Sequence, residues 1–449
     1  MKNRKRYAIV GIGGRHEMYR RAITDTYAET CQLVALCDLN EGRLQLALET
    51  LDDDVKGYNS DAFEQMIEET RPDCVVVTTR DSFHDVYICC ALELGCDVIT
   101  EKPMTTDHQK CQRIIDTQRK TGGKVTVTFN YRYASPRSQV KELLMSGIIG
   151  EVLSMDFHWM LNSKHGADYY RRWHANKENS GGLMVHKATH HFDLVNWWLS
   201  SIPTRVYATG QRKFYTPLTA ERYGLTNRSE RCHDCPDAEK CPFELRMSEN
   251  EKMKALYLDN EHHDGYFRDQ CVFSERIDIE DNMNVIVDYD NDVKLSYSLN
   301  SFCPWEGYII SFNGTRGRIE HKCEEAVTTN DDGSIPGALK EEGNWTRIYP
   351  MREPAYEVET RTAEGGGHGG ADPVMLSYIF DPENQPEDPL MRAADQRAGA
   401  YSILTGIAAN VSLATGTPVD ISSLVKNIGR PDYPPMPASD APLQLIPKN

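Results

Sequence analysis

The sequence has no apolar run that approaches the roughly 20 residues of a membrane-spanning helix. No signal peptide is expected either, because the short apolar run in MKNRKRYAIVGIGG leads directly into glycines and has no small-residue cleavage site. Positive charge is scarce: 50 Lys and Arg against 67 Asp and Glu give a net charge of −17. We therefore expect neither nucleic acid nor a membrane surface as a partner.

A disulfide framework is also missing. The 13 cysteines are odd in number, and several lie in apolar stretches, which favours a reducing compartment and a cytoplasmic protein. The 449 residues, with 40% hydrophobic and 26% charged residues, have ordinary globular composition and enough length for two or three domains.

Short β-branched runs alternate with amphipathic stretches over the first 130 residues. Near-continuous apolar strands between helices predict a doubly wound parallel sheet in an α/β domain that spans residues 1–130. We expect its strands at Tyr7–Gly11, Leu33–Cys37, Cys74–Thr78, Asp97–Thr100 and Val125–Phe129, and two of its helices at Ser60–Glu69 and His84–Leu94.

The pattern changes after about residue 150. Longer alternating strands predict a mostly antiparallel sheet with one face solvated or used for subunit contact. They are expected at Asn284–Tyr289, Val293–Leu299 and Tyr308–Asn313, and helices are expected near 183–199 and at 389–414. Residues 131–449 are thus predicted to form a C-terminal α+β domain, which includes a cysteine-rich insertion at about 228–272.

A glycine-rich segment at 361–373 is predicted to be a mobile loop. It contains His368, with Asp372 nearby. We consider two interpretations, an ordinary loop and a lid over a binding site.

The first strand ends in a glycine turn that leads into a helix pattern. Gly11, Gly13 and Gly14 let the backbone turn tightly and approach a pyrophosphate, whose charge the helix N-terminus attracts. The third glycine of the dinucleotide motif is replaced by His16, but Asp38 follows the second strand, where an acid binds the adenosine ribose. The pattern favours a Rossmann domain that binds NAD rather than NADP; a glycine turn of an unrelated α/β domain is the alternative.

The segment Glu101-Lys102-Pro103 directly follows the fourth predicted strand. Ligands of open α/β sheets bind beyond the carboxyl ends of the strands, so Lys102 is expected at the active site. A lysine can donate a hydrogen bond to a substrate hydroxyl and, with a lowered pKa, accept its proton. The alternative is an ordinary surface loop.

A second group of polar residues lies in the predicted helix at 183–199. His186, His190 and Asp193 fall on one stripe of that helix, with Lys187 and His191 beside them. A histidine beside a carboxylate is typical of a general base or proton relay. A zinc-binding histidine pair and a structural polar helix are the alternatives.

These motifs occur in the order seen in the Gfo/Idh/MocA oxidoreductases, which the chain resembles along roughly residues 6–330. The resemblance is carried by the glycine turn, EKP, Asn130–Tyr133 (NYRY), Gly147–Glu151 (GIIGE), Gly181-Gly182 with His190 and Asp193, and Gly314–Glu320 (GTRGRIE). It implies a Rossmann domain followed by an α/β domain whose large, mostly antiparallel open sheet forms homodimers or homotetramers. Lys102 and His190 would then exchange a proton with the reacting hydroxyl. His186 stands where many members carry Asp and would share that role or bind substrate.

The resemblance and the aromatic, basic stretch at 169–174 together define the candidate site residues; for that stretch, an ordinary surface loop is the alternative. We predict that the catalytic residues are Lys102, His190 and His186. The cofactor-binding residues are predicted to be Gly11, Gly13, Gly14, Arg15, Asp38, Thr79, His84, Glu101 and Lys102. The substrate-binding residues are predicted to be Arg132, Tyr170, Arg172, Trp173, His174, His186, Lys187, His190 and Asp193.

The expected activity is hydride transfer between NAD and a ring hydroxyl of a small carbohydrate, glycoside or sugar derivative. One alternative is an NAD-dependent glycosidase that oxidises, eliminates and reduces without net redox change. A non-catalytic NAD-sensing regulator and a zinc hydrolase are the others.

Three cysteines in the insertion have the spacing of a zinc knuckle. Cys232 and Cys235 are separated by two residues, and Cys241 follows after five more in a polar stretch. Cys271 is the expected fourth ligand, with His233 in reserve. We predict a structural zinc; a metal-free reduced cluster or a disulfide is the alternative.

Overall fold

The N-terminal domain is built on a six-stranded parallel sheet. The computed structural model describes residues 4–52, 54–327, 337–340, 342–361 and 367–437. The strands are β1 (Lys5–Val10), β2 (Cys31–Asp38), β3 (Lys56–Asn59), β4 (Cys74–Val77), β5 (Asp97–Thr100) and β6 (Val125–Val127). Their helices are α1 (His16–Arg21), α2 (Glu41–Leu48), α3 (Phe63–Thr70), α4 (His84–Glu93) and α5 (His108–Thr121). The order β3-β2-β1-β4-β5-β6 is that of a Rossmann sheet.

The five strands predicted from β-branched runs are confirmed, with small differences in their bounds. The sixth, β3, was not predicted because Lys56–Asn59 reads KGYN, a short polar run without alternation. It lies at the edge of the sheet, where one side of a strand remains accessible to water.

The strand order reverses at β1, which pairs with β2 on one side and β4 on the other. A crevice opens at the carboxyl ends of strands where the order reverses in this way. The glycine turn after β1, Asp38 at the end of β2 and Lys102 after β5 all lie at that edge. The fold therefore gathers at one edge the residues that the sequence placed at strand ends.

The C-terminal domain contains a ten-stranded mixed sheet. Its path is β15-β14-β12-β11-β7-β10-β9-β8-β16, with β13 paired to β12; β7 and β10 are parallel and the other pairs are antiparallel. The strands are β7 (Val152–Asn162), β8 (Pro203–Gln211), β9 (Asn282–Tyr289), β10 (Lys294–Cys303), β11 (Glu306–Gly314), β12 (Gly317–Val327), β13 (Gly337–Leu339), β14 (Trp345–Pro350), β15 (Tyr356–Val358) and β16 (Val419–Asp420). The mostly antiparallel sheet expected from the alternating pattern is confirmed.

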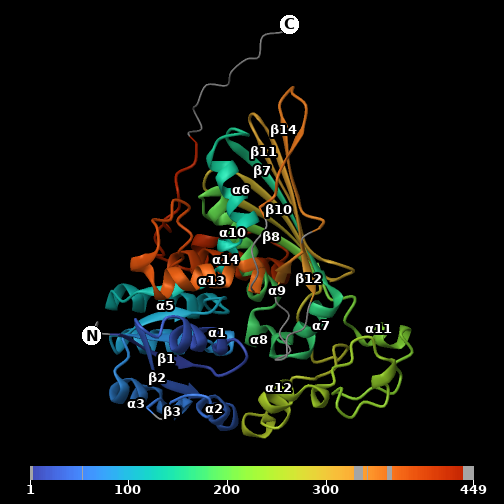
Figure 1. Cartoon of the computed structure of the whole chain (residues 1–449). Coiled ribbons are helices and arrows are strands. Elements are labelled where there is room, and N and C mark those ends of the chain that lie inside the picture. The colour runs from blue at the N-terminus through green and yellow to red at the C-terminus, as the bar shows by residue number, and fades with distance from the viewer. Residues whose placement is uncertain (1–3, 53, 328–336, 341, 362–366, 438–449) are drawn as a thin grey trace.

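Helices cover one side of this sheet: α6 (Ser135–Met145), α10 (Ala188–Leu199) and α14 (Gln396–Thr415) lie there together (Figure 1). Every residue of α10 is buried, including the polar side chains His190, His191, Asp193 and Asn196. Among the described residues, no helix is long and apolar enough to cross a membrane.

Two predicted elements differ from the structure. The helix predicted near 183–199 is divided into α9 (Leu183–His186) and α10, with Lys187 between them. The helix predicted from residue 389 begins at Gln396, because the carboxylate of Asp395 accepts the first free backbone N–H groups of α14.

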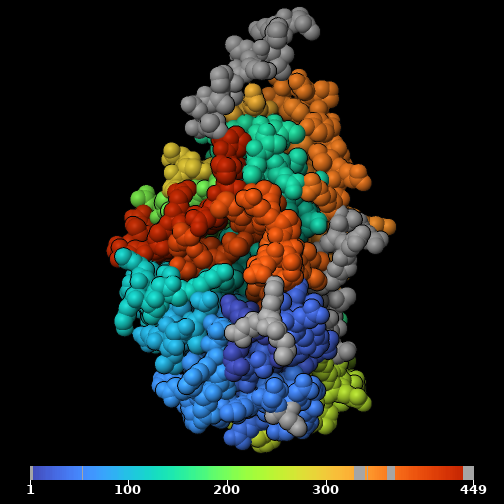
Figure 2. All heavy atoms as spheres, turned by 60° about the vertical axis from the view of Figure 1, so that its left-hand side comes forward, coloured from blue at the N-terminus to red at the C-terminus, as the bar shows by residue number. Residues whose placement is uncertain are grey.

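The C-terminal part of the chain returns to the N-terminal domain. The loop predicted at 361–373 is helical in its second half, because helix α13 (Gly367–Phe380) begins within it. Residues 362–366 and the side chain of His368 lie outside the described part. The ring of Phe380 packs on Tyr7, with centroids 5.2 Å apart. Figure 2 shows this orange segment lying against the blue N-terminal domain. Asp372 of α13 thereby reaches the edge of the crevice.

Candidate active site

One cleft of about 1880 Å³ joins the two domains. It extends from the glycine turn after β1 to the junction of α9 and α10. Most of the predicted site residues line it: Gly11, Gly13, Gly14, Arg15, Asp38, Thr79, His84, Glu101, Lys102, Arg172, Trp173, His174, His186, Lys187 and His190.

The glycine turn forms one end of the cleft. Gly11 has φ +93°, and a Cβ there would lie 2.5 Å from the backbone nitrogen of Thr79, so only glycine fits. A Cβ on Gly13 would meet no atom within 4 Å, which leaves open space beside the turn. The carboxylate of Asp38 accepts hydrogen bonds from the backbone N–H groups of Ile12 and Asn40. This cradle fits the pyrophosphate and adenosine ribose of a dinucleotide.

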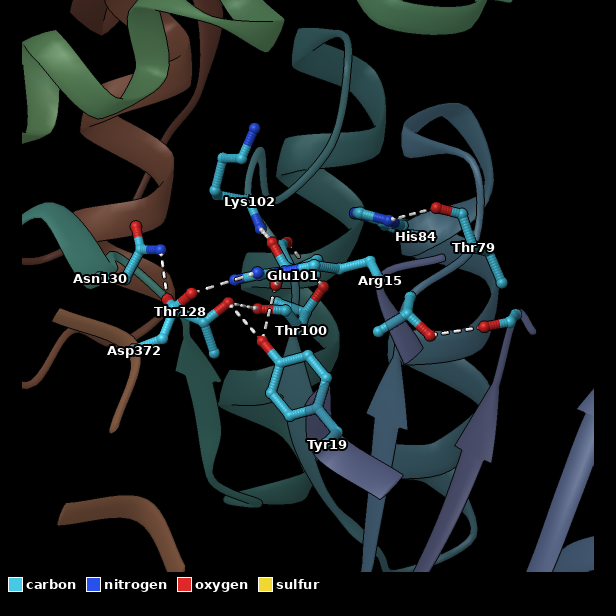
Figure 3. Close-up of polar contacts among 12 residues, drawn as sticks. Arg15, Tyr19, Thr79, His84, Thr100, Glu101, Lys102, Thr128, Asn130 and Asp372 are labelled. Carbon is cyan, nitrogen blue, oxygen red and sulfur yellow. Dashed lines mark hydrogen bonds and ion pairs between the residues drawn. The ribbon is translucent and has the colours of Figure 1, made fainter. Parts of the chain in front are cut away.

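Glu101 is the centre of a buried polar network (Figure 3). Its Oε1 accepts hydrogen bonds from Arg15 Nε at 2.5 Å and from the Tyr19 hydroxyl at 2.7 Å. Arg15 also faces Asp372 at 3.5 Å, and Asp372 accepts a hydrogen bond from the Asn130 amide at 2.6 Å. Burial alone would raise the pKa of Glu101, but the charges of Arg15 and the adjacent lysine hold it below its usual value. Glu101 is therefore an anion that fixes the loop before Lys102.

Lys102 extends from this loop into the cleft, away from Glu101 (Figure 3). Burial lowers the pKa of its ammonium to about 8, although the nearby carboxylates of Asp81 and Glu101 oppose the shift. A lysine with this pKa exchanges protons near neutral pH, which is what a general acid or base requires.

His186 pairs with Asp81, which follows β4. Its Nδ1 lies 2.5 Å from Asp81 Oδ2, and both side chains are almost completely buried. The ring centroid of His174 lies 4.2 Å from that of His186. The His174 ring also stacks on Trp173, with centroids 3.6 Å apart. Burial, followed by the charge of Lys102, lowers the pKa of His186 well below its usual value. The neutral imidazole is therefore oriented by a carboxylate through Nδ1.

His190 lies on α10, on the other side of the break at Lys187. Its ring stacks on Tyr131, with centroids 4.0 Å apart. Lys187 donates a hydrogen bond to the Tyr131 hydroxyl at 3.3 Å and lies 3.9 Å from the carboxylate of Glu306. The break thus turns His186 and His190 toward the cleft from two helices, each with its own partner.

Three predicted substrate-binding residues lie outside the cleft lining. Arg132 and Asp193 form a completely buried ion pair with an Nη2–Oδ1 distance of 2.6 Å. The hydroxyl of Tyr170 donates a hydrogen bond to the Glu280 carbonyl and contacts Ser301 Oγ. The structure assigns these side chains to the support of the cleft wall.

Several residues that the sequence did not single out as site residues also line the cleft: Asp81, Tyr131, His165, Asp168 and Arg268. Tyr169, from the candidate stretch at 169–174, lines it as well. Asp81 follows β4. Residues that follow a parallel strand lie at the crevice, and this rule, which predicted Lys102 after β5, applies equally to Asp81. The carboxylate of Asp168 accepts a hydrogen bond from Arg172 at 2.9 Å and lies 3.6 Å from Arg268. Arg268 comes from the cysteine-rich insertion, whose position the sequence did not indicate.

The four cysteines of the insertion line one small cavity of about 20 Å³. Cys232, Cys235, Cys241 and Cys271 are all free thiols. Within the described ranges, no group of three or more metal-ligating side chains has a geometry that would hold a metal ion. The structure therefore gives no support to the predicted zinc.

The fold and the cleft define an oxidoreductase with an NAD-binding Rossmann domain. The family model described as "Oxidoreductase family, NAD-binding Rossmann fold" matches residues 5–129, and the model of the "C-terminal alpha/beta domain" of the same family matches residues 141–421. The chain belongs to the Gfo/Idh/MocA oxidoreductase family.

Among curated proteins, YteT of Bacillus subtilis (strain 168), whose name specifies an oxidoreductase but no substrate, is 36% identical over 434 residues. That match covers 94% of this chain and 98% of the relative. D-glucoside 3-dehydrogenase of Escherichia coli (strain K12) is 29% identical over 150 residues, which cover 33% of this chain and 41% of the relative. Neither name supports the glycosidase alternative.

Solved structures share the fold at low identity. Aldose-aldose oxidoreductase from Caulobacter crescentus, complexed with glycerol, is 16% identical with a TM-score of 0.60, covering 93% of this chain and all of its own. WlbA dehydrogenase from Bordetella pertussis, in complex with NADH and UDP-GlcNAcA, is 17% identical with a TM-score of 0.61, covering 93% of this chain and 99% of its own.

Proposed function

We propose that this enzyme transfers a hydride between NAD and a ring hydroxyl of a sugar or sugar derivative. The proposal rests on one observation: the nucleotide end and the substrate end belong to a single continuous cleft. Its glycine turn and Asp38 suit a dinucleotide, and its other end contains Lys102, His186 and His190. The sugar class is supported by relatives named as glucoside and inositol dehydrogenases.

In the oxidation direction, a C–H bond of the substrate breaks and its electron pair leaves as a hydride. When bound, NAD⁺ supplies the acceptor for that hydride. The hydroxyl proton passes to neutral Lys102, whose amine lies in the cleft with a pKa of about 8. The products are a ketone, NADH and the protonated lysine, and the reverse reaction uses the ammonium as acid.

The substrate end of the cleft suits a hydroxylated ring. Trp173 and Tyr169 offer aromatic surface, and Arg172 and Lys187 offer hydrogen-bond donors. His186 and His190 line the same end of the cleft and can bond to ring hydroxyls. We propose that these six residues and Lys102 bind and react with the sugar.

The proposal is tested by incubating the enzyme and NAD⁺ with a panel of hexoses, glycosides, cyclitols and sugar acids. We expect NADH formation at 340 nm with at least one member of the panel. Binding of NAD without turnover of any member, in either direction, would indicate a non-catalytic protein and refute the proposal.

The enzyme is expected to bind NAD⁺ more tightly than NADP⁺. Asp38 lies at the end of β2, where its carboxylate binds ribose hydroxyls but repels a 2′-phosphate. Calorimetric titration of both nucleotides measures the preference. Equal dissociation constants would contradict this assignment of Asp38.

We further propose that the open face of the C-terminal sheet joins subunits into a homodimer or homotetramer. Tyr207 and Ile286 form a cross-strand pair on this face and are 41% and 55% exposed, and Ile309 is 37% exposed. Exposed apolar side chains that gather on one surface are typical of an interface. Ile286→Glu should reduce the molar mass measured by light scattering, whereas Leu218→Glu, at another exposed apolar residue, should not. A wild-type monomer would contradict the proposal.

A further inference from the structure

The cysteine-rich insertion (residues 228–272) belongs to the C-terminal half of the chain but docks on the N-terminal domain. In Figure 1 its helix α12 (Glu251–Met253) lies beside α2. The Asn40 amide donates a hydrogen bond to the Asn260 carbonyl at 2.8 Å. An added Cβ on Gly42 would lie 1.7 Å from the Asn260 side chain, so the absence of a side chain at Gly42 permits this contact. The insertion is therefore fitted to the turn that follows β2.

The docked insertion reaches the nucleotide end of the cleft. The Tyr257 hydroxyl accepts a hydrogen bond from the backbone N–H of Gly14 at 3.3 Å. Lys252 pairs with Glu17 of α1 at 2.8 Å. The side chains of Lys252, Tyr257 and Asp264 all line the cleft together with the glycine turn. The walls of the nucleotide site thus include residues from outside the Rossmann domain.

The important contact is between Arg43 of α2 and Asp264 of the insertion. Arg43 Nη2 forms an ion pair with Asp264 Oδ2 and lies 3.7 Å from Asp38 Oδ1. The three side chains are only 9–10% exposed and line the cleft together. Within the described residues, Arg43 Nε and Nη1 make no hydrogen bond.

These positions bear on the choice between the two dinucleotides. In Rossmann domains an acid after the second strand binds the ribose 2′-hydroxyl of NAD, whereas a nearby arginine binds the 2′-phosphate of NADP. Here the Rossmann domain contains both, Asp38 and Arg43. Asp264 supplies a second carboxylate that engages the arginine, so the group has two negative charges and one positive charge.

We propose that Asp264 is a specificity-determining residue for the dinucleotide. By pairing with Arg43, it withholds the guanidinium from a 2′-phosphate and leaves a net negative charge at that point of the cleft. The cysteine-rich insertion thus adds to the selectivity that Asp38 gives the Rossmann domain. The inference rests on the proposed use of NAD but does not depend on the sugar substrate.

The test is calorimetric titration of NAD⁺ and NADP⁺ into the full-length Asp264→Asn variant. Hydrogen bonds to charged groups are among the stronger ones, so release of Arg43 should raise NADP⁺ affinity roughly 10- to 100-fold. NAD⁺ affinity should change by less than about threefold. Asp259→Asn is the matched control, because it removes an exposed carboxylate of the same segment that pairs with Lys254.

A double variant identifies the responsible cation. In Arg43→Gln/Asp264→Asn the gain in NADP⁺ affinity should disappear. If Asp264→Asn does not fold, as judged by circular dichroism, Asp264→Ser provides the same release of Arg43. A folded Asp264 variant that keeps the wild-type ratio of NADP⁺ to NAD⁺ affinity would overturn the proposal, and so would a gain that survives the loss of Arg43. Failure of the wild type to bind NAD⁺ would instead refute the proposed function.

Discussion

Turnover should fall by roughly 10²–10⁴-fold in Lys102→Met, while the dissociation constant of NAD⁺ stays within about threefold of the wild-type value. The reason is that the methionine side chain fills a similar volume in the cleft but cannot exchange a proton with a hydroxyl. Lys120→Met is the matched control, since Lys120 lies on α5 and is 77% exposed. Steady-state kinetics and calorimetry on the same preparations separate turnover from nucleotide binding.

The rates of oxidation and reduction should also depend on pH in opposite directions. The amine accepts a proton only when neutral, so the rate of sugar oxidation should rise as the pH increases through about 8, the pKa of Lys102. The rate of ketone reduction should fall over the same range, because the ammonium is then lost. A variant with wild-type turnover and an unchanged profile would show that Lys102 is not the proton-transfer group.

The second large effect is expected at the pair of Asp81 and His186. Asp81→Asn should lower turnover by roughly 10–10³-fold, because the carboxylate both orients His186 and faces Lys102. Burial raises the pKa of Asp81 well above its usual value, and in its ionised form Asp81 raises the pKa of Lys102. Removal of this carboxylate should therefore also shift the rise in oxidation rate to lower pH. Asp85→Asn is the control, because Asp85 is an equally buried carboxylate that pairs with Arg113.

The two members of the pair should act as a unit. The double variant Asp81→Asn/His186→Gln is expected to lose little more activity than the more damaging single variant, since either change alone already removes the carboxylate–imidazole pair. Fully additive losses in kcat would mean that Asp81 and His186 contribute independently. An unshifted pH profile in Asp81→Asn would mean that Asp81 supports the structure without acting on Lys102.

The residues that the sequence located correctly are those fixed by local patterns. β-branched runs mark the strands, and the carboxyl end of a parallel strand places whatever follows it at the crevice. Gly11, Asp38 and Lys102 reach the cleft for this reason. A turn or a loop directly after a strand allows little freedom in where its side chains lie.

The partners of these residues depend on contacts between distant segments. His186 meets Asp81 across 105 positions, and Arg43 meets Asp264 across 221. Helical periodicity placed His186 and Asp193 on one stripe, but the break at Lys187 separates them, and Asp193 pairs with Arg132 instead. No regular repeat connects such segments, so the sequence alone does not predict which side chains meet.

The central claim is that a ring carbon of a sugar and NAD exchange a hydride in this cleft. It is tested most directly by incubating the enzyme and NAD⁺ with sugars that carry deuterium on every ring carbon, and then analysing the nucleotide by mass spectrometry. We predict that the wild type forms NADH that carries one deuterium. The rate of its formation should be roughly 10²–10⁴-fold lower in Lys102→Met. Conversion of a deuterated sugar with no deuterium in the nucleotide would contradict the account.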